Sequence, residues 1–189
     1  TASSKQLGEL SLEFARQGHS VTVLIPESAQ KERWCLENLG EVKVLRLSAL
    51  KTKDVGYIRR TFGEISMPFY MIINFRKSPQ FSETWNGIVW YSPSIFHGLF
   101  VWYLKKRSHC KGYLIVRDIF PEWAVDLGLM KRGLPYFFFK LVEFFQYSVA
   151  DIIGVQTLSN SYYFDKWAKK PNRKLEVLQN WLKNPAKKR

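Results

Sequence analysis

The stretch Tyr113-Leu114-Ile115-Val116-Arg117-Asp118-Ile119-Phe120-Pro121-Glu122-Trp123 decides the fold class of this chain. The apolar run 113–116 is typical of a buried strand, and Arg117 and Asp118 end it abruptly. Pro121 then forces a turn before a helix can begin. In open α/β sheets, ligands bind beyond the carboxyl ends of the strands. We therefore interpret Arg117 and Asp118 as the centre of a candidate site, with an exposed ion pair at a strand end as the alternative.

Strand and helix patterns alternate on both sides of this stretch. Because helices between short apolar strands must cover a sheet, we predict an α/β fold with a Rossmann-like parallel sheet and helices on both faces. A helix followed by a strand is the second half of a βαβ unit, so we expect the first strand of that unit to be missing from the start of the chain. The predicted strands are 21–25, 42–47, 88–91, 113–116, 151–155 and 175–178, and the predicted helices are 4–17, 54–75, 95–106, 123–127, 134–148 and 158–168.

The charge balance restricts the class of partner. The chain has 29 Lys and Arg against 16 Asp and Glu, which gives a net charge of +13 and favours anionic partners. A basic nucleic-acid-binding module is therefore an alternative. The chain has no RNP-like aromatic signature, zinc-ligand spacing or helix-turn-helix pattern, so we expect no nucleic-acid partner. The sequence predicts neither a metal site nor a cofactor.

Several segments, in order, resemble the N-terminal half of retaining GT-B glycosyltransferases of family 4. These are 8–26, which includes EFARQGHSVTVLIP, and IVWYSPSIFHG (88–98), VRDIFPEWAVDLGLM (116–130), SVADIIGVQTLSNSYYF (148–164) and VLQNW (177–181). The third segment is the most specific, and it is similar to bacterial O-antigen and capsule transferases of the L-fucosamine type. The resemblance covers nearly the whole chain, and it implies that 1–181 form the GT-B N-terminal domain and that 182–189 are a hinge remnant or basic tail.

This resemblance implies an enzyme that transfers a sugar from a nucleotide-sugar donor to a lipid-linked glycan in surface polysaccharide synthesis. In the family, the N-terminal domain chiefly binds the acceptor, and a second domain with a Glu-x7-Glu signature makes most donor contacts. That domain and the glycine-rich loop after the first strand are not in this sequence, so we expect little or no turnover by residues 1–189 alone. A split subunit that needs a separate donor-binding chain is a further alternative.

The candidate site residues follow the predicted strand ends. Arg117 would neutralise phosphate or orient a carboxylate, and Asp118 would hold a sugar hydroxyl; we assign both to catalysis. Glu122 is a substrate-binding candidate, with a helix N-terminal carboxylate as the alternative. Thr157 and His97 also have simpler interpretations, as a helix cap and a structural histidine. The substrate-binding candidates are Tyr91, Ser92, Ser94, His97, Glu122, Gln156, Thr157 and Asn180.

Two helical segments raise the question of a membrane surface. The segment 54–75 combines an apolar stripe with flanking Lys and Arg residues, so it fits either an anionic membrane interface or the core. The Phe-rich helix 134–148 is expected to be core. The uncharged segment 84–104 is interrupted by Gly, Pro and polar residues and predicts a strand, a turn and a helix, not a membrane span. We expect a cytoplasmic protein, peripheral at the inner face of the cytoplasmic membrane.

Overall fold

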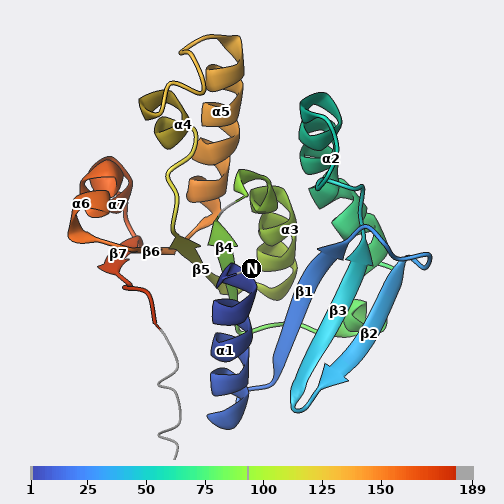
Figure 1. Cartoon of the computed structure of the whole chain (residues 1–189). Coiled ribbons are helices and arrows are strands. Elements are labelled where there is room, and N and C mark those ends of the chain that lie inside the picture. The colour runs from blue at the N-terminus through green and yellow to red at the C-terminus, as the bar shows by residue number, and fades with distance from the viewer. Residues whose placement is uncertain (1, 93, 182–189) are drawn as a thin grey trace, which may run out of the picture.

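The strands form two β-sheets in the residues that the computed structural model describes, 2–92 and 94–181. The first sheet has the order β1-β3-β2, and the second has the order β4-β5-β6-β7 (Figure 1). The second sheet is wholly parallel, whereas β2 pairs antiparallel with β3 in the first. The strands are β1 (Val21–Glu27), β2 (Trp34–Leu39), β3 (Val42–Ser48), β4 (Gly87–Ser92), β5 (Lys111–Val116), β6 (Ile152–Val155) and β7 (Lys174–Val177).

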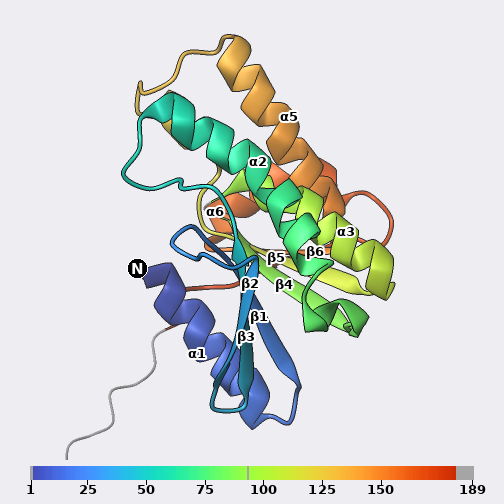
Figure 2. The same ribbon diagram turned by 90° about the vertical axis from the view of Figure 1, so that its right-hand side faces the viewer.

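Helices cover the strands from both sides. Figure 2 shows α1 on one side of the strands and α2, α3 and α5 on the other. The predicted α/β class with a Rossmann-like parallel sheet is therefore confirmed. The helices are α1 (Ala2–Arg16), α2 (Tyr57–Phe75), α3 (Gly98–Ser108), α4 (Glu122–Asp126), α5 (Leu134–Val149), α6 (Leu158–Ser161) and α7 (Asp165–Ala168), and the 3₁₀ turns are η1 (Pro79–Ser82), η2 (Ile95–His97) and η3 (Tyr162–Phe164).

Packed apolar side chains join these layers. Val42 and Val44 of β3 pack with Ala15 of α1 on one face, and Leu45 and Leu47 pack with α2 and α3 on the other. This division follows from the strand period, because successive side chains point to opposite faces. The second sheet contributes Leu114, Val116, Ile153 and Val155 to a separate cluster with α3, α5 and the C-terminal helices.

Several element boundaries differ from the sequence predictions. β2 was not predicted, because its C-terminal half is exposed and its sequence WCLENL shows no clear apolar alternation. Pro26 lies inside β1 and does not end it, since β1 is an edge strand and an edge strand tolerates a missing N–H. The predicted helix 158–168 is divided into α6, η3 and α7, and the helix 95–106 begins as η2. The expected tail 182–189 lies outside the described residues.

Two glycines have a clear structural reason. Gly18 has a φ of +87°, and its N–H donates to Ala15 O at 2.9 Å, so it ends α1 in the left-handed conformation. Gly98 begins α3 directly against α5. A Cβ at Gly98 would lie 2.8 Å from Cα of Gln146, so only glycine allows the two helices to approach this closely.

Candidate functional site

The strand register places most of the sequence-predicted residues near the carboxyl ends of the strands in the second sheet. Ser92 of β4 is level with Val116 of β5, and Val116 is level with Val155 of β6. Arg117 and Gln156 follow these strands directly, and Asn180 follows β7. The carboxyl ends of parallel strands therefore meet at a common rim, which is where such folds bind ligands.

A cavity of about 390 Å³ opens at this rim. Arg117, Asp118 and Glu122 all line it, so the structure brings together three of the predicted site residues. Asp118 is exposed at the mouth, and the ion pairs among the described residues include none between Arg117 and Asp118. The remaining lining residues are Ile119, Trp123, Asp126, Asn160 and Tyr163.

Arg117 is the most unusual group in the cavity, because its side chain is only 8% exposed. Its Nη1 donates to Leu178 O at 2.8 Å, and its guanidinium lies 5.2 Å from the ring centroid of Trp181. Its Nε and Nη2 are buried without a partner in the described structure. These two nitrogens form one edge of the planar fork, the edge that holds two oxygens of a carboxylate or phosphate. A buried donor pair without a partner is costly, so this edge is suited to an anionic ligand.

A polar network lies beside Arg117 and supports Glu122. Lys140 Nζ contacts Glu122 Oε1 at 2.6 Å and Glu143 Oε2 at 2.7 Å. The Tyr163 hydroxyl donates to Glu143 at 2.9 Å, and the Tyr136 hydroxyl donates to Glu122 at 3.1 Å. Glu122 Oε2 is buried and has no partner among the described residues. Glu122 Oε2 therefore has an unused capacity to accept a hydrogen bond.

Burial controls the ionisation of this network. Burial raises the pKa of the Glu143 carboxyl, although Lys140 opposes the shift. Burial and the adjacent Glu143 raise the pKa of Tyr163 far above its ordinary range, so this hydroxyl stays a donor. Burial alone disfavours the charged Lys140, but its bonds to Glu122 and Glu143 outweigh that effect and raise its pKa. Lys140 and Tyr163 therefore remain hydrogen-bond donors within the network.

The remaining predicted residues of β4 and the following turn do not line the cavity. Ser92 is buried within β4, and Ser94 caps η2 by accepting from Phe96 N at 3.4 Å. His97 is half-buried at the end of η2, where burial lowers its pKa to about 4. Ser94 therefore acts as a helix cap, and neither Ser94 nor His97 is part of the cavity lining.

The other predicted residues lie elsewhere along the same rim. Thr157 caps α6 by accepting from Asn160 N at 3.3 Å, and Gln156 is half-buried directly before it. Gln6 of α1 connects two of the predicted residues: its Nε2 donates to Asn180 Oδ1 at 3.3 Å, and its Oε1 accepts from the Tyr91 hydroxyl at 3.5 Å. Gln6 therefore connects α1 to Tyr91 and Asn180 through two long hydrogen bonds.

Sequence reasoning missed Gln6, Lys140, Glu143 and Tyr163. Gln6 had no distinguishing signal in its helix. Lys140 and Glu143 had a distinguishing signal. They are the only charged residues of the largely apolar helix α5, and they are three residues apart. Charged side chains in such a helix are expected to be paired when the helix is covered.

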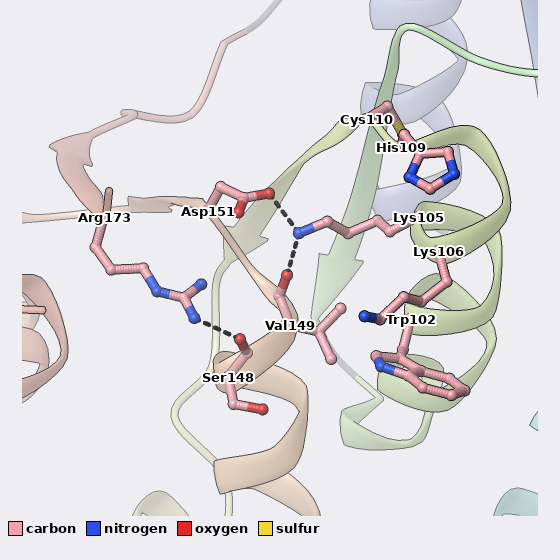
Figure 3. A pocket seen from close by; sticks show the side chains of 9 residues that line it. All are labelled: Trp102, Lys105, Lys106, His109, Cys110, Ser148, Val149, Asp151 and Arg173. Atoms are coloured by element: carbon pink, nitrogen blue, oxygen red, sulfur yellow. Dashed lines mark hydrogen bonds and ion pairs between the residues drawn. The ribbon is translucent and has the colours of Figure 1, made fainter. Parts of the chain in front are cut away.

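A second cavity lies at the opposite ends of the strands. Figure 3 shows Lys105 between the Val149 carbonyl, at 2.6 Å, and the Asp151 carboxylate, with Arg173 donating to Ser148 O at 2.6 Å. Asp151 also accepts from Gly112 N at 2.7 Å. The Lys105 ammonium and the Asp151 carboxylate thus join the end of α5 to the start of β5 and β6. We interpret this cavity as structural.

Comparison with known protein-family models gives no match to this chain, and comparison with curated proteins gives none either. Among the described residues, no cluster of three or more His, Cys, Asp or Glu side chains is arranged to hold a metal ion. In the same residues, no helix has both the length and the apolar character that a membrane crossing requires. The structure itself defines an α/β domain with a polar cavity at the rim of a parallel sheet, lined by one arginine and three carboxylates.

Proposed function

We propose that this chain is the acceptor-binding domain of a retaining GT-B glycosyltransferase of family 4. The whole enzyme would transfer a sugar from a nucleotide-sugar donor to a lipid-linked glycan during bacterial O-antigen or capsule synthesis. The ordered sequence resemblance over 8–181 suggests the family, and the parallel α/β sheet is compatible with it. In this proposal the donor binds mainly on a second domain, and residues 1–189 alone have little or no activity.

The buried edge of Arg117 is the observation that carries this proposal. A diphosphate presents pairs of oxygens at the spacing that Nε and Nη2 of one guanidinium can hold. The lipid carrier of the proposed acceptor is a prenyl diphosphate, and a fixed guanidinium in a partly dry site stabilises such negative charge. Asp118 and Glu122, on the same cavity wall, accept hydrogen bonds from sugar hydroxyls.

The test measures binding of a water-soluble, short-chain prenyl diphosphate that carries one N-acetylhexosamine. Calorimetry with residues 1–189 should detect this ligand, and Arg117→Gln should bind it about 10- to 150-fold more weakly. That range corresponds to the loss of a charged hydrogen-bonding partner, about 1.5–3 kcal/mol.

Arg173→Gln is a closely matched control. Arg173 also donates to a backbone carbonyl, Ser148 O at 2.6 Å, and also lies 5.2 Å from a tryptophan ring centroid, that of Trp167. Both variants therefore lose one carbonyl bond and one cation–π contact, but only Arg117 lines the proposed site. Equal affinity in the Arg117→Gln and Arg173→Gln proteins would refute the proposed function.

A further inference from the structure

The helices α2 and α5 leave large apolar side chains uncovered. In α5 the exposed residues Leu134, Phe137, Leu141 and Phe144 recur at helical spacing, whereas the polar Glu143 and Gln146 are buried. The expectation that helix 134–148 is core is therefore wrong for one side of the helix, because Glu143 and Gln146 face the protein and an apolar stripe faces outward. An apolar stripe left in water on a folded domain commonly marks an interaction surface.

The exposure is greatest at the N-terminal ends of the two helices. Ile58 of α2 and Leu134 of α5 are each 87% exposed, and Phe62 is 64% exposed. Figures 1 and 2 show both ends projecting beyond the strands on the same side of the molecule. We name the segments 51–62 and 127–138 together the apical surface.

Basic residues are concentrated on the apical surface. The two segments contain six Lys and Arg residues and a single acidic residue, Asp54. Arg60 pairs with Glu64 at 2.9 Å, while the exposed Lys53, Arg59 and Lys131 have no ion pair among the described residues. Apolar side chains between unpaired cations match the boundary between headgroups and acyl chains of an anionic membrane.

We propose that the apical surface docks on an anionic lipid bilayer, with the exposed apolar side chains in the headgroup–acyl boundary and the cations among the lipid phosphates. The charge distribution favours this occupant over a second copy of the chain. Self-association through this surface would place the same set of cations against itself, and like charges oppose such contact.

Docking in this orientation also affects the candidate site. The apical segment 127–138 follows α4 directly, and α4 contributes Glu122, Trp123 and Asp126 to the site cavity. The cavity would thus lie next to a segment that contacts the bilayer from which a lipid-linked glycan is presented. This link to the acceptor rests on the proposed function, whereas docking itself rests on the exposed residues and charges alone.

The experiment is flotation of residues 1–189 with two kinds of vesicle, one of phosphatidylcholine and one of phosphatidylcholine mixed with phosphatidylglycerol. Flotation is expected with the anionic vesicles and should decrease as salt increases. Arg59→Gln combined with Lys131→Gln should weaken partition about thirtyfold, from roughly 1 kcal/mol for each cation. Ile58→Ser combined with Phe137→Ser should weaken it more than tenfold, and all four residues are exposed, so these variants should fold.

Lys106→Gln combined with Lys111→Gln is the charge-matched control, because both residues are exposed near the opposite strand ends. Docking is refuted if the control and the apical double variant float equally, or if the wild-type chain does not float at low salt. It is also refuted if the apical variants instead abolish a dimer measured by light scattering. Binding of the soluble prenyl diphosphate is scored separately, so loss of that binding with intact flotation rejects only the proposed function.

Discussion

Gly98→Ala tests whether close contact between α3 and α5 is a source of stability. The new Cβ would lie 2.8 Å from Gln146 Cα and 3.1 Å from Gln146 Cβ. Carbon atoms pack at about 3.5–4.0 Å, so the helices must separate by roughly 1 Å. Overpacking of this kind costs about 1–3 kcal/mol of unfolding free energy.

Urea unfolding and thermal melting measure this cost. For a domain of this size, 1–3 kcal/mol corresponds to a Tm decrease of roughly 2–12 °C. Gly8→Ala is the control, since nothing lies within 4 Å of its new Cβ in helix α1. That substitution should raise stability by up to about 1 kcal/mol, because alanine is the better helix former. The reasoning fails if Gly98→Ala is as stable as the wild type or moves in the same direction as Gly8→Ala.

Two further substitutions test half-buried polar groups. Burial lowers the pKa of His97 from 6.5 to about 4, so the unfolded chain gains a proton before the folded chain does as pH falls. Stability should therefore decrease between pH 6.5 and 4, and His97→Gln should show a smaller decrease in urea titrations across that window; parallel curves would contradict this. Asp151→Ala should cost about 1–3 kcal/mol, because Gly112 N and Lys105 lose their acceptor. An unchanged urea midpoint would count against that assignment.

The sequence predicted the second sheet better than the first. Strands such as 113–116 are continuous apolar runs that end in polar residues, and buried parallel strands have this pattern. β2 lacks the pattern because it is an antiparallel strand whose C-terminal half is exposed. The strand ends also indicated the rim, so Arg117, Asp118 and Glu122 could be found as neighbours of one cavity.

The supporting network could not be predicted from local sequence. Glu143 is buried because Tyr163, twenty residues later, donates to it. Gln146 is buried by η2 and Gly98, more than forty residues earlier. The periodicity of α5 therefore identified a helix, but which side faced the protein was decided by partners from distant segments.

β1 is an edge strand of the first sheet and β4 is an edge strand of the second, and in the described residues no backbone hydrogen-bond ladder pairs them. No strand pairing within residues 2–92 and 94–181 joins the two halves, so they are coupled mainly through the packed side chains of α2 and α3, such as the Phe75–Phe100 contact at 6.0 Å. Where no backbone pairing joins the two halves, we expect one half to open locally while the other stays folded. An extended segment that paired with both β1 and β4 would join the two sheets into one. The two halves would then unfold together.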